Sequence, residues 1–314
     1  MEDVIIVKDL KKIYRQKQFV NKALDGIFFK IKRGEFISVI GPDGAGKTTL
    51  IKILCGILNY ENGEVNVLGV NLPIQLDKVK SRIGYLSQKF SLYGNLTVEE
   101  NLNYFGKIFG LDKYRERMEK LLKTVKLDEF RDRLACNLSG GMKQKLGVIC
   151  GLIHSPEIFF LDEPTTGVDP VSRREIIKLI EAMIEEGITV VMSTSYMDEA
   201  ERAHRVLMLD KGKLIQEGSY YQLLEDCRWQ NLVIEIEGGD CYHYDIDKIK
   251  GVRFLTERSG TIHIIVDESF SLDLLKERLE GITANIFFEP LSMEDLFIAN
   301  HIRSKERLDD NNSG

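Results

Sequence analysis

A glycine-rich loop near the N-terminus has the residue types and the spacing that bind phosphate groups. The residues from Gly41 to Thr48 follow the pattern G-x-x-x-x-G-K-[ST], between a predicted strand and a predicted helix. Glycines let the backbone wrap around a phosphate with its N–H groups pointing inward, and the helix N-terminus adds partial positive charge. Lys47 would reach the β- and γ-phosphates, and the Thr48 hydroxyl would ligate Mg²⁺. The predicted binding residues are Gly41, Pro42, Asp43, Gly44, Ala45, Gly46, Lys47, Thr48 and Thr49.

Two carboxylates follow another predicted strand. Residues 158–161 form an apolar run that ends in Asp162 and Glu163. Because parallel strands place their carboxyl ends at one edge of a sheet, this pair is expected beside the phosphate-binding loop. There Asp162 is suited to holding Mg²⁺ through water, and Glu163 is suited to polarising an attacking water as a general base.

The elements that would position these side chains alternate between strands and helices. Strands are predicted at residues 4–7, 36–40, 158–161 and 189–192, with a helix at residues 173–186. This order is typical of an α/β protein with a parallel sheet. Residues 96–125 read as an amphipathic helical segment that begins with the capping-box pattern Thr97-x-x-Glu100. Beyond about residue 220, strands are predicted at residues 232–236, 252–255, 262–266 and 284–288, and helices at residues 272–279 and from 292.

Composition limits the class of protein. The 314 residues suffice for about two domains, and the net charge of -6 argues against non-specific nucleic-acid binding. No apolar stretch reaches the roughly 18 residues that span a bilayer, and the N-terminus lacks a signal-peptide pattern, so we expect neither a membrane-spanning nor a secreted chain. The five histidines show no metal-ligand spacing. The odd number of scattered cysteines predicts reduced packing thiols, at Cys55, Cys136, Cys150, Cys227 and Cys241.

A third motif gives the sequence a resemblance to a known family. The segment LSGGMKQ, residues 138–144, precedes the acidic pair, and together with the glycine-rich loop it resembles the nucleotide-binding subunit of ATP-binding-cassette (ABC) transporters. The matching signature motif of that family usually ends in Gln, where this chain has Met; its residues here are Ser139, Gly140, Gly141 and Met142.

Three further positions extend the resemblance, which covers roughly residues 3–220 and rests on six motifs in family order. Gln88 resembles the Q-loop glutamine, Asp169 the D-loop aspartate, and Tyr14 the aromatic residue that stacks on adenine. Each also has a plainer interpretation. Tyr14 could be a surface residue of an edge strand, Gln88 an ordinary loop residue, and Asp169 the start of a helix.

The resemblance implies a fold and a mode of assembly. The fold is a P-loop NTPase cassette over residues 1–221, with a RecA-like α/β core, an antiparallel edge sheet and a helical lobe near residues 85–155. The implied cofactors are ATP and Mg²⁺, with metal ligands from Thr48, Gln88 and Asp162. Two cassettes, identical or different, would dimerise head to tail. ATP would then lie between one P-loop and the partner's signature, where a serine hydroxyl and glycine N–H groups at a helix N-terminus form a second anion site.

One position departs from the family pattern. The family has a switch histidine that contacts the γ-phosphate and holds the activated water, and this chain has Ser195 there. His204, in a predicted helix, does not replace it. We therefore expect slow hydrolysis by the catalytic residues Glu163, Gln88 and Ser195, and a chain that pairs with a different, intact cassette. The alternative is structural, because Ser195-x-x-Asp198 is also a capping-box pattern.

The C-terminal part is predicted to be a small accessory α+β domain, residues 222–302, followed by a disordered tail, residues 303–314. Residues 289–298, EPLSMEDLFI, resemble the terminal helix of ABC-2-type exporter ATPases, which serve drug, antibiotic and polysaccharide export. This resemblance implies an exporter. Ser292-x-x-Asp295 is also a helix-start pattern, so a dimerising or regulatory role and a merely capped helix both stay open.

The resulting hypothesis is an ATPase subunit, cytoplasmic and peripheral on the inner face of the cell membrane. It would drive separate transmembrane permease subunits, which would contact residues 88–96 and the helical lobe, and it would have no nucleic-acid partner. One alternative is a soluble ABC ATPase that acts on ribosomes or DNA; such proteins usually carry two cassettes or a long coiled-coil insertion, and this sequence shows neither. Another is a regulatory cassette that binds ATP without hydrolysing it.

Overall fold

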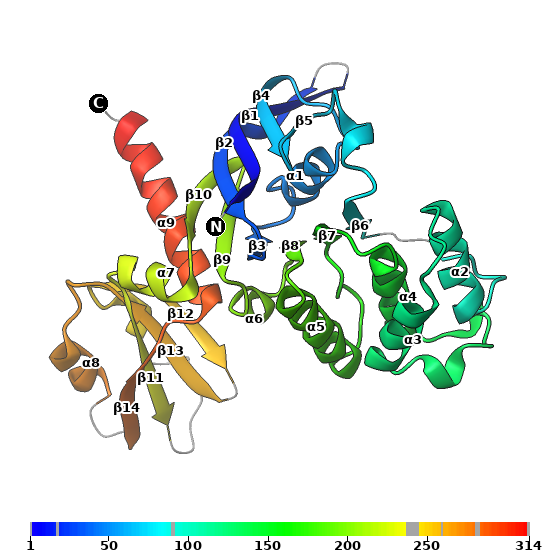
Figure 1. The fold of residues 1–314 in the computed structure, drawn as a ribbon. Helices are drawn as coiled ribbons and strands as arrows, with labels where there is room; N and C mark the ends of the chain where they lie inside the picture. Colours follow the sequence, from blue (N-terminus) through cyan, green and yellow to red (C-terminus); the bar gives the residue numbers. More distant parts are fainter. Residues whose placement is uncertain are drawn as a thin grey trace. The chain divides into compact units, whose positions relative to one another are not determined.

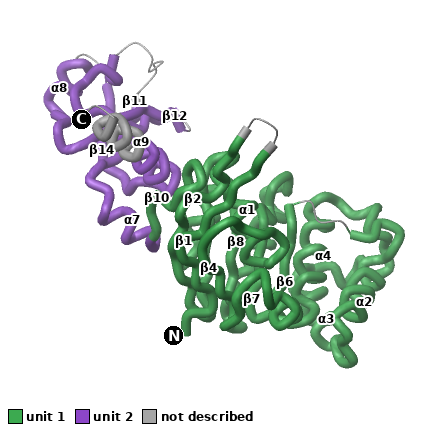
Figure 2. The backbone as a smooth tube through the Cα atoms, turned by 90° about the horizontal axis from the view of Figure 1, so that it is seen from above, with its two compact units in different colours: residues 1–217 green, residues 218–314 purple. Residues whose placement is uncertain are grey.

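The chain divides into two compact units, Met1–Glu217 and Gly218–Gly314, coloured separately in Figure 2. The computed structural model describes residues 2–16, 19–88, 92–236, 245–258, 260–279 and 283–312. The boundary expected from the sequence, between residues 221 and 222, would cut helix α7 (Tyr220–Asp226). This helix begins in the second unit behind a Ser219 N-cap, so the chain divides just before that cap.

A six-stranded sheet forms the centre of the first unit. Its strand order is β10-β9-β3-β8-β7-β6, and the pairs from β9 to β6 are parallel. The strands are β3 (Phe36–Ile40), β6 (Ile83–Leu86), β7 (Ile158–Asp162), β8 (Thr189–Ser193), β9 (Arg205–Asp210) and β10 (Lys213–Gly218). Every residue of β3, β7 and β8 is buried, as continuous apolar runs predict for strands covered on both faces.

Helices cover the two faces of this sheet, and alternation along each strand decides which side chains they meet (Figure 1). Helix α1 (Lys47–Leu54) shares a hydrophobic cluster with Phe160 and Val191. Helix α5 (Pro170–Glu185) shares the opposite cluster with Phe159 and Val190. The predicted helix at residues 173–186 thus begins one turn earlier, because Asp169 caps it ahead of Pro170.

An antiparallel sheet packs beside the core through the cluster that contains α1. Its order is β2-β1-β4-β5, with β1 (Asp3–Gln16), β2 (Phe19–Lys32), β4 (Asn62–Val67) and β5 (Val70–Leu72). The α/β core and the antiparallel edge sheet agree with the predicted fold class. The first strand extends well beyond the predicted residues 4–7. The prediction missed its outer half because charged residues alternate with apolar ones there and no continuous apolar run marks it.

Three helices of the first unit lie between β6 and β7: α2 (Val98–Ile108), α3 (Arg115–Thr124) and α4 (Gly140–Leu152). The Thr97–Glu100 capping box is confirmed, with the Glu100 N–H donating to Thr97 Oγ1 over 3.1 Å. The helical segment predicted at residues 96–125 is two helices, since the chain turns at Gly110, whose φ is +64°. These helices fall within the range proposed for the helical lobe.

The second unit is an antiparallel sheet with helices. Its strand order is β12-β13-β11-β14. Helix α9 begins behind Ser292, whose hydroxyl accepts from the Asp295 N–H, while the Asp295 carboxylate accepts from the Ser292 N–H. The remaining elements are β11 (Gln230–Ile236), β12 (Val252–Arg258), β13 (Thr261–Val266), α8 (Leu272–Arg278), β14 (Ala284–Glu289) and α9 (Met293–Asn312).

Three expectations need correction or fall outside the description. The backbone of residues 303–312 continues helix α9, where a disordered tail was predicted; its Lys, Glu, Arg and Leu residues are good helix formers. Cys136 is exposed and is no packing thiol, unlike the buried Cys55 and Cys150. Cys241 and His243 lie outside the described residues. Within the described ranges, no helix is both long and apolar enough to cross a membrane.

Candidate nucleotide site

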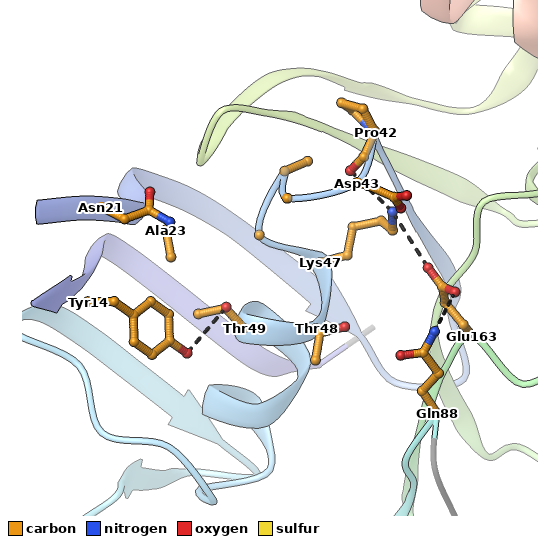
Figure 3. Close-up of a pocket in the computed structure, with 13 residues that line it drawn as sticks. Tyr14, Asn21, Ala23, Pro42, Asp43, Lys47, Thr48, Thr49, Gln88 and Glu163 are labelled. Carbon is orange, nitrogen blue, oxygen red and sulfur yellow. Dashed lines mark hydrogen bonds and ion pairs between the residues drawn. The ribbon is translucent and has the colours of Figure 1, made fainter. Parts of the chain in front are cut away.

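The phosphate-binding loop joins β3 to α1 and forms one wall of a pocket of about 260 Å³. Gly46, the N-cap of α1, has a φ of +107°, and a β-carbon there would lie 2.4 Å from the backbone oxygen of Ala23. Only glycine fits this position without strain. The Lys47 side chain is buried, and its Nζ donates to the Gly41 oxygen over 2.7 Å and to the Pro42 oxygen over 3.3 Å, so its charge is held inside the loop. Figure 3 shows this lysine beside Pro42.

The pocket brings together most of the residues that the sequence assigned to nucleotide binding. Tyr14 extends from β1 at one end, and its hydroxyl lies 3.5 Å from Thr49 Oγ1 (Figure 3). Asn21 and Ala23 of β2 also line the wall, and sequence reasoning did not single them out, because nothing in their local pattern marks them. The other lining residues are Pro42, Asp43, Gly44, Ala45, Gly46, Lys47, Thr48, Gln88 and Glu163.

The hydroxyl of Thr48 and the carboxylate of Asp162 meet at the carboxyl edge of the parallel sheet. Thr48 Oγ1 donates to Asp162 Oδ1 over 3.0 Å, and Asp162 is 1 % exposed. Burial, and after it the Asp162 carboxylate, raises the pKa of the nearby Tyr85 hydroxyl above its usual value. Neighbouring hydroxyl and carboxylate oxygens beside a phosphate loop are the donor set that Mg²⁺ takes together with nucleotide phosphates, so these residues fit that ion.

Glu163 has an unusual backbone conformation for a residue other than glycine. Its φ is +49°, in the left-handed region. Its N–H is directed at Ser193, with 3.0 Å to the side-chain Oγ and 3.1 Å to the carbonyl oxygen. Strained conformations of this kind persist where the surroundings fix them, and they concentrate at functional sites.

The Glu163 carboxylate accepts hydrogen bonds from three side chains. Gln88 Nε2 donates over 3.1 Å, and Thr166 Oγ1 and Ser195 Oγ each donate over 3.0 Å. Lys47 Nζ lies 3.6 Å away, and Figure 3 shows the carboxylate between this lysine and Gln88. The predicted catalytic residues therefore converge on one carboxylate. Thr166, which opens the segment that resembles the D-loop, joins them although it was not among the predicted catalytic residues.

Ser195 does not cap a helix, so the alternative reading of Ser195-x-x-Asp198 is wrong. Helix α6 (Met197–Ala200) has Tyr196 at its N-cap, without a side-chain hydrogen bond. Thr194 makes the side-chain hydrogen bond to the backbone here: its hydroxyl accepts from the Tyr196 N–H over 3.0 Å. Ser195 is thereby free to turn toward Glu163.

His204 is not in a helix either, because α6 ends at Ala200. Its Nδ1 accepts from the Phe36 N–H over 3.0 Å, just before β9 begins. Phe36 is the first residue of β3, and the phosphate loop follows the other end of that strand. His204 therefore lies at the opposite end of strand β3 from the phosphate loop.

The signature and D-loop residues form a second group that does not line the pocket of this chain. Ser139 is the N-cap of α4, and its Oγ accepts from the Met142 N–H over 3.3 Å. A β-carbon on Gly141 would lie 2.2 Å from the Ser172 Oγ, so only glycine lets α4 approach α5 this closely. Asp169 caps α5, and the Ser172 backbone N–H holds the pKa of its carboxyl below the usual value.

Comparison with known proteins agrees with this geometry. The family profile described as ABC transporter matches residues 24–166. The Nod factor export ATP-binding protein I of Burkholderia pseudomallei (strain K96243) is 34 % identical over 303 residues, which cover 94 % of this chain and 96 % of the relative. This chain belongs to the ABC transporter ATP-binding proteins.

Two further matches cover the cassette alone. The probable multidrug ABC transporter ATP-binding protein YbhF of Escherichia coli (strain K12) is 42 % identical over 220 residues, and the chain spans 37 % of the length of that relative. A solved dimeric structure of an ATP-binding cassette in a post-hydrolysis state, bound to ADP and Pi, matches with a TM-score of 0.63 and 28 % identity. It covers 68 % of this chain and 98 % of its own, so the shared part is a complete cassette.

Proposed function

We propose that this chain is the ATP-binding and hydrolysing subunit of an exporter, and that it powers a separate transmembrane permease. Two relatives are named as multidrug and Nod factor export ATP-binding proteins, which supports export as the direction of transport. The observation that carries the ATPase part is the convergence of Lys47, Gln88 and Ser195 on the Glu163 carboxylate beside the phosphate loop.

Each side chain has a distinct part in this proposal. Loop N–H groups and Lys47 bind the phosphates, and Tyr14 stacks on the base. Thr48, Asp162 and Gln88 would hold Mg²⁺, which would neutralise charge on the β- and γ-phosphates. Glu163 orients the attacking water and accepts its proton. Water must reach Glu163, which the 12 % exposure of its side chain permits.

We further propose that ATP is held between two cassettes. The signature residues Ser139, Gly140, Gly141 and Met142 stand at the N-terminus of α4, where N–H groups and the helix dipole favour an anion. Since they do not line this chain's own pocket, they are available to a partner's nucleotide. The dimeric cassette bound to ADP and Pi supports this arrangement by analogy. The partner is a second copy or a different cassette.

The serine at position 195 is proposed to slow hydrolysis. Its hydroxyl is short and is already engaged with Glu163, so it supplies neither the reach nor the positive charge of an imidazole. Binding elements and the general base remain. We therefore propose a site that binds ATP and turns it over slowly, in a chain that pairs with a cassette carrying the histidine.

Steady-state ATP hydrolysis by the purified chain tests this proposal. The wild type is expected to turn over slowly, Glu163→Gln to abolish turnover, and Ser195→His to raise it. Ser195→Ala is the matched variant that removes only the hydroxyl. Brisk wild-type turnover that collapses in Glu163→Gln would contradict the weak-site part. Failure of the wild type to bind ATP at all would overturn the function itself.

The permease contact is proposed for residues 88–96 and the helices α2 to α4, and it would place the chain at the inner face of the cell membrane. Residues 89–91 of this stretch lie outside the described residues. Alanine and charge-reversal scanning at residues 92–96 is expected to uncouple transport while sparing ATP binding. Salt-resistant co-purification with a polytopic membrane protein supports the transporter role, whereas co-sedimentation with ribosomes rejects it.

A further inference from the structure

One buried hydroxyl joins the two carboxylate residues of the site. Ser193 is the last residue of β8, and its side chain is fully buried. Its Oγ donates to Asp162 Oδ1 over 2.7 Å and accepts from the Glu163 N–H over 3.0 Å. The hydroxyl therefore donates its single proton to Asp162 and accepts the Glu163 N–H with an oxygen lone pair.

The two partners of Asp162 differ in what they can do when a metal is present. Thr48 Oγ1 also donates to Asp162 Oδ1, but this hydroxyl is proposed as a metal ligand, so its oxygen faces the ion. Ser193 comes from the strand paired with β7 and is not among the residues that line the pocket. It can keep its hydrogen bond to the carboxylate whether or not the metal is bound.

The second hydrogen bond bears on the general base. Glu163 holds a left-handed φ of +49°, which costs about 1–3 kcal/mol unless its surroundings impose it. The Ser193 Oγ and carbonyl oxygen lie 3.0 and 3.1 Å from its N–H, so one residue fixes this peptide. Turning the peptide away would also move the carboxylate out of reach of Gln88 and Ser195.

We propose that Ser193 is a positioning residue that orients Asp162 toward Mg²⁺ and holds the Glu163 backbone in its strained conformation. This inference rests on the proposed ATPase function. Ser193 would thus contribute both to the affinity for Mg²⁺ and to the position of the general base Glu163. Partners that orient a metal ligand typically change metal affinity or activity by 10- to 100-fold when they are removed.

The test compares Ser193→Ala with Ser38→Ala. Ser38 is equally buried, lies in the same sheet on β3 opposite Met192, and its Oγ has no hydrogen-bond partner among the described residues. Both substitutions remove the same atom, and only the first removes hydrogen bonds. The readout is binding of a fluorescent ATP analogue to the full chain, titrated with Mg²⁺ and repeated without it.

Ser193→Ala is expected to raise the half-saturating Mg²⁺ concentration at least about tenfold while leaving metal-free binding unchanged. Ser38→Ala should match the wild type in both measurements. A merely structural role would weaken both kinds of binding together, and that result, or an unchanged Mg²⁺ midpoint, overturns the inference. If Ser193→Ala does not fold, Ser193→Cys decides by the same criterion. A wild type that binds no Mg²⁺–nucleotide overturns the proposed function instead.

Discussion

Arg173 of α5 ties down the segment that carries Ser195. Its Nε donates to Glu199 Oε1 over 2.6 Å, and its guanidinium stands 3.8 Å from the centroid of the Tyr196 ring. The Glu199 side chain is 2 % exposed, and its second oxygen accepts from Thr194 Oγ1 over 2.6 Å. The arginine thus neutralises a buried carboxylate that in turn orients the residue before Ser195.

The substitution Arg173→Met keeps much of the side-chain volume and removes the cation. An unpaired buried charge costs about 3–5 kcal/mol. The arginine side chain is itself 21 % exposed, so water can partly replace it, and we take the lower end, about 3 kcal/mol. For a unit of 150–250 residues this corresponds to a fall in Tm of about 6–12 °C.

Differential scanning calorimetry of the full chain measures this loss in the transition of residues 1–217. The double variant Arg173→Met with Glu199→Gln should recover most of the stability, since no buried charge is then left unpaired; the other partner of Arg173, Asp198, is 74 % exposed. Arg202→Met is the matched control. Its ion pair with Glu181 is exposed on both sides and is worth about 0–1 kcal/mol. A fall of less than about 2 °C in Arg173→Met, or no recovery in the double variant, refutes the reasoning.

Three further predictions concern the loop, the signature and acid stability. Gly46→Ala should weaken binding of a fluorescent ATP analogue about 5- to 140-fold, because of backbone strain of about 1–3 kcal/mol; near wild-type affinity would contradict this. Gly141→Ala should lower the free energy of unfolding by about 1–3 kcal/mol through the clash with Ser172, measured by denaturant titration; unchanged stability would show that α4 shifts freely. The hydrogen bond from Arg82 is the main cause that holds the pKa of Glu157 at about 2, below its usual value of 4.5. This stabilisation is therefore present above about pH 4.5 and disappears as the pH falls toward 2. With the Glu157 side chain 34 % exposed, it is worth about 1 kcal/mol, so Glu157→Gln should lower Tm by about 2–4 °C at pH 7 and progressively less in acid.

Local patterns predicted the elements of the site well where the physical cause is itself local. The strand at residues 36–40 has the predicted bounds, because a continuous apolar run has one favourable place, inside the sheet. The capping box at Thr97 formed as predicted, since both partners are three residues apart on the same turn.

The same reasoning failed where a distant residue competes for a side chain. Ser195 and Asp198 have the spacing of a capping box, but Ser195 donates to Glu163, just after strand β7, and Asp198 pairs with Arg173 of α5. The capping-box pattern considers only the four residues 195–198, and neither Glu163 nor Arg173 is among them. The helix predicted around His204 is wrong for a similar reason, because α6 ends at Ala200 and His204 instead accepts a hydrogen bond from the Phe36 N–H of β3.

The sequence by itself determined the chemistry that this protein can perform. Loop glycines, a lysine, a threonine and an acidic pair predict a site for phosphate and Mg²⁺ through residue type and spacing, since the loop groups act from neighbouring positions and the pair stands together at a strand end. Tertiary structure alone decided which side chains hold that chemistry in place. Ser193 and Arg173 gain their roles from strand pairing and helix packing, which join residues that are distant in sequence. The residues next to them in the sequence do not indicate which distant partners they contact.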